Sequence, residues 1–416
     1  MEDEQPSVAI IGAGPIGIEA ALYARYLGFP VTVYDAGRIC EHVRQWGHVQ
    51  LFSPFRLNCS SLGLSALTAQ NPNPDHPLPA EEDFHTGKQW VDSYLEPLAN
   101  SDLVRRSLRL NTKVESIARD TSQVDQETAR GEVPFRIKTR DAKGKQAIDS
   151  ADIVIDATGT FGQANSFGIG GMPVVDEPQD LPNSRYSQRI PDLGEYRPAD
   201  GDHFMVVGRG YSAATNILQI KQLQSQHPGI RCTWLTRGTS GSPAGPMSVM
   251  NDDPLPYRNE LATTANELAT KAEWLDWKPG LEIKAVERTD NGFQIKLSDD
   301  QDISVTHLLA NTGFHGDYQM LQPLQVHRCY ASGGPMAWAA SVVGTSGDCL
   351  QQTSSGPAAI KTTEPNFFII GSKSYGTDPR FLFSTGLQQI RDVFKLVAER
   401  ETLDLYSTLK PNTVGG

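Results

Sequence analysis

The stretch VAIIGAGPIGIEAAL, residues 8–22, decides the fold, because it joins an apolar strand to a helix through three spaced glycines. Gly12 is expected to allow a tight turn, Gly14 to let the backbone approach a pyrophosphate, and Gly17 to let the helix pack closely on the strand. The amino end of such a helix offers unpaired N–H groups to phosphates. Residues 12–17, the first glycine turn, therefore predict a βαβ unit that binds a dinucleotide rather than a strand and helix merely punctuated by glycine.

The same pattern occurs a second time, far along the chain. The stretch FMVVGRGYSAATNIL, residues 204–218, again places a turn between an apolar strand and a helix. Gly208 and Gly210 take the first two glycine positions, and Ala213 is a small substitute at the third. Residues 208–213, the second glycine turn, predict a second dinucleotide unit.

Opposite charges follow the two turns. The next strand after the first turn, residues 31–34, is followed by Asp35, whereas the next strand after the second turn, residues 232–235, is followed by Thr236 and Arg237. A carboxylate at this position accepts hydrogen bonds from a ribose 2′-OH, and an arginine accommodates a 2′-phosphate. The first site is thus predicted to bind a plain adenosine ribose and the second NADPH. Arg209 and Arg231 are the alternative partners of the phosphate.

Composition excludes several classes of protein. A chain of 416 residues predicts two or three domains, and a net charge of −12 argues against nucleic acid as a partner. Five cysteines, odd in number and without paired spacing, are typical of a reducing cytosol. We find no signal-peptide pattern, apolar membrane span or spaced metal-ligand set, so a soluble, cytoplasmic, metal-free protein is expected. A homodimer is the candidate assembly.

Two similar phrases flank the second glycine turn. Residues 151–159 end in Ala157-Thr158-Gly159, and residues 307–313 end in Asn311-Thr312-Gly313. The second nucleotide unit is therefore predicted to be inserted into the first. Residues 120–132 are polar and are expected to form a solvated hairpin tip between two strands.

These motifs, in this order, resemble the two-dinucleotide-binding-domain flavoproteins, a superfamily that includes thioredoxin reductase-like enzymes and flavin-containing monooxygenases. The phrases at residues 46–54 and 370–376 are most similar to poorly characterised monooxygenase-like or bacillithiol-disulfide-reductase-like members. The resemblance implies an α/β fold with two Rossmann-like, three-layer domains. FAD would bind to residues 1–165 and 306–416, and NADPH to the inserted residues 166–305.

The resemblance also implies which residues line the two cofactors. The expected FAD contacts are Gly12, Gly14, Pro15, Gly17, Asp35, Ala36, Trp46, Val114, Thr158, Gly159, Gly371, Ser372 and Gln388. The expected NADPH contacts are Gly208, Gly210, Ser212, Ala213 and Arg237. Hydride would pass from NADPH to the flavin and then to oxygen or another acceptor.

Departures from the family patterns shape the predicted reaction. The chain lacks the redox cysteine pair of the dithiol reductases, and Cys40 is followed by Gln45 where a second cysteine would stand. Pro15-Ile16 occupies the place of the cysteine of bacillithiol-type reductases. The F-x-G-x-x-x-H pattern of class B monooxygenases is also absent. Because oxygen activation needs no protein thiol, a monooxygenase-like reaction is favoured. The alternatives are an NADPH:acceptor reductase, for a quinone, ferredoxin or small disulfide, and a non-catalytic redox sensor.

Candidate catalytic side chains come from two regions expected beside the flavin. Asn58 could donate hydrogen bonds, His48 could relay a proton, and Cys349 could act as a redox thiol. Each has a plain structural alternative: Asn58 could satisfy loop backbone groups, and an unpaired cysteine or a histidine near aromatics is often buried for packing.

Overall fold

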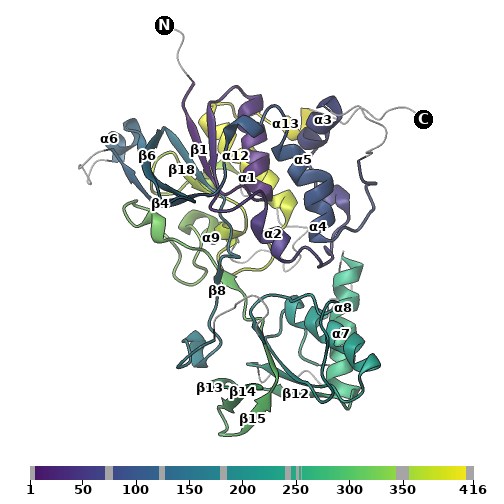
Figure 1. Cartoon of the computed structure of the whole chain (residues 1–416). Coiled ribbons are helices and arrows are strands. Elements are labelled where there is room, and N and C mark those ends of the chain that lie inside the picture. The colour runs from purple at the N-terminus through teal and green to yellow at the C-terminus, as the bar shows by residue number, and fades with distance from the viewer. Residues whose placement is uncertain are drawn as a thin grey trace. The chain divides into compact units, whose positions relative to one another are not determined.

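The computed structural model describes residues 5–70, 78–120, 127–178, 185–238, 245–249, 253, 255–342 and 356–408. The chain divides into two units (Figure 1). The first unit is Met1–Gln163 with His315–Gly416, and the second unit is Ala164–Phe314. Each contains a five-stranded parallel sheet, which confirms the predicted α/β fold with two Rossmann-like units.

The boundaries of the second unit differ from those expected at residues 166 and 305. Strand β16 (His307–Ala310), which was expected in the first domain, pairs in parallel with β10 (His203–Val207) of the second unit. Its four residues are all buried, so they belong to the core of that sheet. The short strands β8 (Gln163–Ala164) and β17 (Phe314–His315) pair with each other at the two chain crossings.

The parallel sheet of the first unit has the order β18-β7-β1-β2-β3. Its strands are β1 (Val8–Ile11), β2 (Val31–Tyr34), β3 (Leu108–Arg109), β7 (Ile153–Asp156) and β18 (Phe367–Ile369). Asp156 lies opposite Ile11 on one side and Ile369 on the other. The carboxyl ends of β1, β7 and β18 therefore meet at one edge, where the first glycine turn begins.

Successive side chains of these strands point to opposite faces of the sheet, so each face packs against a different layer. Ile10, Ile155 and Phe368 face a core that includes helices α1 (Pro15–Tyr26) and α12 (Phe383–Val397), whereas Ala9 and Val154 face a second, antiparallel sheet. That sheet is β4 (Thr112–Arg119), β5 (Phe135–Asp141) and β6 (Gln146–Ala151).

The helices of the first unit are α1 (Pro15–Tyr26), α2 (Glu41–Gln45), α3 (Ser61–Gln70), α4 (Gly87–Trp90), the π-helix η2 (Val91–Leu95), α5 (Glu96–Ala99), α6 (Glu127–Glu132), α9 (Met336–Val342), α10 (Pro357–Ile360), α11 (Ser372–Tyr375), α12 (Phe383–Val397) and α13 (Leu405–Thr408). The described part of this unit also has three 3-10 helices, η1 (Phe55–Leu57), η3 (Arg105–Ser107) and η5 (Gln319–Leu321).

The expected hairpin tip at residues 120–132 is not simply solvated where the structure describes it. Helix α6 carries Arg130, whose Nη2 donates to Oε2 of the buried Glu364 at 2.6 Å. Arg119 Nε donates to the other oxygen of Glu364 at 2.8 Å. A buried carboxylate is costly unless it is paired, and these two guanidinium groups satisfy it. The predicted hairpin is confirmed, because β4 and β5 pair antiparallel on either side of this segment. Residues 121–126 of the expected tip lie outside the described residues. Arg130 departs from the expected solvated character because its partner carboxylate lies far away in the sequence.

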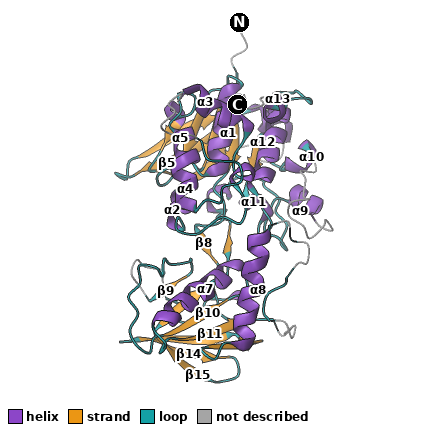
Figure 2. Ribbon diagram, turned by 90° about the vertical axis from the view of Figure 1, so that its right-hand side faces the viewer, coloured by secondary structure: helices purple, strands orange, loops and turns teal. Residues whose placement is uncertain are grey.

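The second unit repeats the layered plan (Figure 2). Its parallel sheet has the order β12-β11-β10-β16-β9, with β9 (Tyr186–Ser187), β11 (Arg231–Thr236) and β12 (Leu275–Pro279) beside β10 and β16. Helices α7 (Tyr211–Gln226) and α8 (Pro256–Lys271) pack on each other and on this sheet. The antiparallel strands β13 (Ile283–Thr289), β14 (Gly292–Leu297) and β15 (Asp302–Val305) share a core with its other face, and η4 (Ile169–Gly171) is a short 3-10 helix. None of the described helices is both long and apolar enough to cross a bilayer.

Helix α1 buries an acidic side chain. Glu19 is completely buried, and its carboxyl group accepts hydrogen bonds from the hydroxyls of Tyr94 and Ser60, the latter at 2.8 Å. Burial raises the pKa of Glu19 to about 7, although the two hydrogen bonds oppose the shift. Glu19 is therefore a neutral acid at mildly acidic pH.

We expect the stability of the protein to fall as the pH rises from about 4.5 to about 7. Over this range the native state holds a proton on Glu19 that the unfolded state has lost, because the native pKa of about 7 exceeds the ordinary 4.5. The linked loss in unfolding free energy is about 3 kcal/mol. Denaturant titrations across this pH range should show that Glu19→Gln removes this part of the slope. Parallel pH profiles for the variant and the wild type would contradict the assignment.

Candidate dinucleotide sites

The three glycines of the first turn have different surroundings. Gly12 has a φ of +109°, and an added Cβ would lie 2.7 Å from the carbonyl oxygen of Ala157. A Cβ on Gly17 would lie 1.8 Å from the carbonyl oxygen of Gly12. In contrast, a Cβ on Gly14 would meet no atom within 4 Å. Neighbouring backbone thus leaves no room for a side chain at the first and third glycines, whereas the space beside the second glycine is open.

Helix α1 begins at this open glycine. Gly14 is the N-cap residue, no side chain caps the helix, and no acidic residue lies in its first turn. The first N–H groups of a helix lack intrahelical partners and carry partial positive charge. The open side of the first glycine turn is therefore suited to an anionic group such as a pyrophosphate.

Asp35 is attached to the same turn. Its Oδ2 accepts a hydrogen bond from the N–H of Ala13 at 2.6 Å, and its Oδ1 accepts one from the N–H of Gly37 at 2.8 Å. An ionised carboxylate has about four acceptor positions, so each oxygen retains a position for a ribose hydroxyl. Ala36, which lies between Asp35 and Gly37 in the sequence, is exposed.

Two distant segments meet the first glycine turn at the carboxyl edge of the sheet. The Cβ position of Gly12 lies 3.1 Å from Cα of Thr158. The Cβ position of Gly159 lies 3.3 Å from Oγ of Ser372. That of Gly371 lies 3.7 Å from the side chain of Ile16, in helix α1. The fold thus brings together three motifs that the sequence separates by more than 100 residues.

Other expected FAD residues have packing roles that the structure defines. The ring of Trp46 lies against Gly87, where an added Cβ would be 2.6 Å away. Val114 is buried between the two sheets of the first unit. Pro15 is the first residue of α1, and Gln388 is half-buried on α12.

Two buried polar residues at this edge were missed by sequence reasoning. Gln389 accepts the N–H of Gly371 with Oε1 at 2.8 Å and donates from Nε2 to Ser374 Oγ at 2.7 Å. Lys373 is fully buried and forms an ion pair with Asp156 at 2.6 Å. Lys373 lies in the phrase at residues 370–376 that carries part of the family resemblance, but a lysine shortly after a strand is commonly an exposed charge, so its burial was not predicted.

The second glycine turn reproduces the geometry of the first. Gly208 has a φ of +118°, and its Cβ position lies 2.3 Å from the carbonyl oxygen of Asn311. Ala213 is completely buried, whereas a Cβ on Gly210 would meet nothing within 4 Å. Gly210 is the N-cap of α7, again without a side-chain cap or an acidic residue in the first turn. Ser212 is exposed in that turn.

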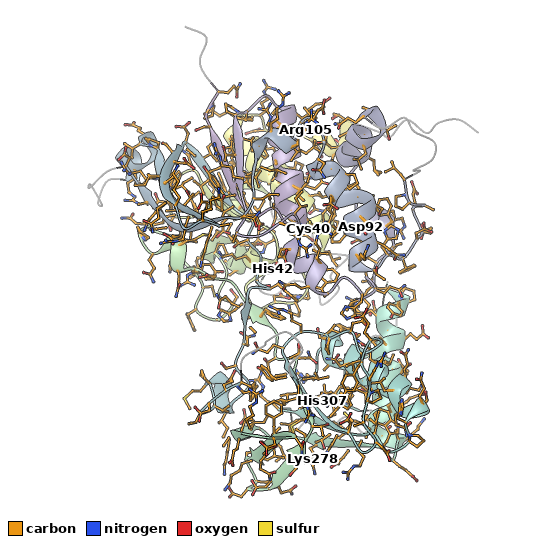
Figure 3. The ribbon with its side chains drawn as sticks, viewed as in Figure 1. Cys40, His42, Asp92, Arg105, Lys278 and His307 are labelled. Carbon is orange, nitrogen blue, oxygen red and sulfur yellow. The ribbon has the colours of Figure 1, made fainter. Side chains whose placement is uncertain are left out.

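Cations gather near the carboxyl end of β11. Arg237 is exposed directly after this strand, and Arg209 is exposed within the second glycine turn. Arg231 opens the strand and so lies at its opposite end. Lys278, labelled in Figure 3, lies opposite Leu235 in the neighbouring strand β12 and pairs with Asp276 at 3.1 Å. Sequence reasoning did not consider Lys278, although it is the last residue but one of the next strand of the sheet.

The three catalytic candidates are placed unequally. Asn58 is buried, and its Nδ2 donates to the carbonyl oxygens of Ser53 and Pro54 at 3.0 Å, so its amide supports its own loop. Nε2 of His48 is buried without a partner among the described residues, so His48 remains a catalytic candidate. Cys349 lies outside the described residues.

Cys40, which contacts the first glycine turn, is poorly suited to redox chemistry. The N–H of Cys40 donates to the carbonyl of Ala13 at 3.0 Å, but its side chain is buried and its pKa is raised by that burial. Burial also raises the pKa of Cys59 to about 12. The ring centroid of His42, labelled in Figure 3, lies 5.7 Å from that of Phe161. His42 is a titratable group near Phe161 and Gly162 that sequence reasoning missed.

Comparisons with known proteins agree with this geometry. Residues 9–336 match the model of the pyridine nucleotide-disulphide oxidoreductases, whereas a search of curated proteins gave no match. The chain is similar to the bacillithiol disulfide reductase Bdr (YpdA) of Bacillus cereus, with 19% identity, a TM-score of 0.67, and coverage of 95% of this chain and 100% of that chain.

Two monooxygenase structures share the same fold. The ornithine N-hydroxylase of Kutzneria sp. 744 has 13% identity and a TM-score of 0.63, covering 96% of this chain and 100% of that one. The FAD-bound cadaverine monooxygenase of Erwinia amylovora has 14% identity and a TM-score of 0.60, covering 96% of each chain. The predicted resemblance to two-dinucleotide-domain flavoproteins is confirmed.

Proposed function

Because the chain belongs to the pyridine nucleotide-disulphide oxidoreductase family, we propose that it is an oxidoreductase that binds FAD in its first unit and NADPH in its second. The observation that carries this proposal is the paired geometry of the glycine turns. Each is closed where the fold needs a small residue and open at Gly14 or Gly210, at the start of an uncapped helix. Bound FAD would supply the redox chemistry by accepting a hydride from NADPH.

The residues of the first unit fit the parts of FAD. The N–H groups at the start of α1 would hold the pyrophosphate, and Asp35 would accept hydrogen bonds from the adenosine ribose. Thr158, Gly159 and Ser372 would line the cofactor from the opposite side of the turn. In the second unit, the start of α7 and Arg237 would hold the pyrophosphate and the 2′-phosphate of NADPH.

We propose that the reaction is monooxygenase-like, with oxygen as the acceptor and a small organic molecule as the substrate. Burial raises the pKa values of Cys40 and Cys59, so these two thiols are poor sources of a thiolate nucleophile, whereas a backbone hydrogen bond from Ser332 lowers the pKa of Cys329. The second candidate is an NADPH:acceptor reductase, which the family's disulphide-reducing name and the fold of the bacillithiol disulfide reductase favour. A cytoplasmic homodimer without a nucleic-acid partner also belongs to the proposal.

Anaerobic reduction by NADPH followed by a pulse of oxygen separates these candidates. For a monooxygenase we expect NADPH to bleach the bound flavin and the oxidised spectrum to return with a lag after the oxygen is consumed. Immediate return with stoichiometric free peroxide, together with fast turnover of quinones or disulfides, would instead establish the reductase. Yellow protein that NADPH cannot bleach would contradict both and favour a redox sensor.

We expect Arg237→Ala to weaken the binding of NADPH at least about tenfold, since a hydrogen bond to a charged group contributes about 1.5–3 kcal/mol. The KM for NADH should change little, because NADH lacks the 2′-phosphate. Flavin reduction with each coenzyme is the measurement. Arg231→Ala is the matched control, because Arg231 opens the same strand at its other end. Equal losses with both coenzymes would refute the assignment.

A further inference from the structure

We infer that Lys373 is a positioning residue for FAD, because its buried ammonium group fastens the Thr158–Gly159 turn to the Gly371–Ser372 turn. This inference rests on the proposed function, since both turns line the proposed FAD site. It adds a residue of the 370–376 segment that was not among the expected FAD contacts.

All three N–H donors of the Lys373 ammonium have acceptors. Nζ donates to Oδ2 of Asp156 at 2.6 Å, to Oγ1 of Thr158 at 3.1 Å, and to the carbonyl oxygen of Asp317 at 2.5 Å. The ring centroid of Tyr318 lies 4.6 Å from Nζ and covers it further. One side chain thus joins the end of β7, the start of α11 and the segment at residues 317–318.

Asp156 extends this network into the turn itself. Its Oδ1 accepts the N–H of Thr158 at 3.1 Å and the Oγ1 hydroxyl of Thr158 at 2.7 Å. The Thr158 hydroxyl therefore donates to Asp156 and accepts from Lys373. Because its single O–H donor is used by Asp156 and one lone pair by Lys373, Thr158 can contact a cofactor only through its backbone, its methyl group or the remaining lone pair of Oγ1. The conformation of the turn depends on the ion pair.

The location of the pair indicates a role in positioning rather than stability alone. Both side chains are fully buried, and desolvation of two charges commonly offsets most of their attraction. An apolar pair would be about as stable in many proteins. What an apolar pair could not do is hold a hydroxyl and an N–H of the turn in one orientation. A site held in its binding conformation binds its ligand more tightly, because less ordering is needed on binding.

The first unit contains a natural control for this inference. Glu364 and Arg119 form a second fully buried ion pair, at 2.8 Å. Glu364 precedes β18, whereas Lys373 follows it, so the two pairs lie at opposite ends of one strand. Loss of either pair should destabilise the fold, but only loss of the Lys373 pair should disturb the FAD site.

The test measures FAD affinity and apo-protein stability for three variants of the full chain. We expect Lys373→Met to raise the FAD dissociation constant at least about tenfold, and the milder Thr158→Val about threefold or more. Glu364→Gln should lower the denaturation midpoint while its folded fraction binds FAD within about twofold of the wild type. The visible absorption spectrum of bound FAD should shift in the first two variants and not in the third.

A double variant tests whether removing both charges restores the FAD affinity that is lost when only one is removed. The double variant Lys373→Met with Asp156→Asn removes both charges and keeps an acceptor for Thr158, so it should regain part of the lost FAD affinity. Unchanged affinity and spectrum in both Lys373→Met and Thr158→Val would overturn the inference, as would equal effects from Glu364→Gln. If Lys373→Met does not fold, Thr158→Val decides alone. A wild-type chain that fails to bind FAD would overturn the proposed function itself, and this inference with it.

Discussion

Gly14→Val is expected to abolish FAD binding while the apo-protein stays folded. Gly14 has φ −80° and ψ −177°, an extended conformation that valine adopts readily, and its Cβ position meets nothing within 4 Å. The unfolding free energy should therefore change by less than about 1 kcal/mol. The new side chain would occupy the space at the uncapped start of α1 that the pyrophosphate needs, so FAD affinity should fall at least about 100-fold. Fluorescence titration of apo-protein with FAD, beside denaturant unfolding, measures both quantities.

Gly17→Ala is the matched control in the same turn. Its Cβ would lie 1.8 Å from the carbonyl oxygen of Gly12, so helix α1 must move away from the strand. Such overpacking costs about 1–3 kcal/mol or more, which should appear in the apo-protein. A Gly14→Val protein that binds FAD like the wild type would show that the cofactor does not approach this turn.

Gly210→Val is expected to block reduction by NADPH without loss of bound FAD. Gly210 has φ −86° and ψ 174°, and its Cβ position is also free of neighbours within 4 Å. A valine there should leave both units folded but prevent the pyrophosphate of NADPH from reaching the start of α7. The rate of flavin bleaching at subsaturating NADPH should fall at least about 100-fold, with the flavin content unchanged. Chemical reduction by dithionite should still bleach the flavin.

Gly208→Ala supplies the structural counterpart in the second unit. Its Cβ would lie 2.3 Å from the carbonyl oxygen of Asn311, at a φ of +118° that disfavours alanine, so it should destabilise that unit. If NADPH bleaches the Gly210→Val flavin at the wild-type rate, the nicotinamide coenzyme does not use the second glycine turn. The two glycine pairs thus test the two proposed sites independently.

Much of this architecture follows from local sequence. Residues 8–22 and 204–218 predicted strand, turn and helix because apolar runs and spaced glycines act within one short segment. The boundary of the second unit does not follow from local sequence. The apolar residues of strand β16 would suit the core of either unit, and only the pairing of β16 with β10 assigns it to the second. Asn58 showed the limit for side chains, because its amide could serve a loop or a substrate until its contacts with Ser53 and Pro54 were known.

The sequence by itself determined that two dinucleotide turns exist, with Asp35 after one and Arg237 after the other. Only the tertiary structure decided which glycines are closed by the fold, because Ala157 and Asn311 reach Gly12 and Gly208 from distant strands. It also decided that Lys373 is a buried partner of Asp156 rather than an exposed surface charge. Periodicity and spacing report on neighbours along the chain, whereas burial and ion pairing depend on segments that meet only when the sheet forms.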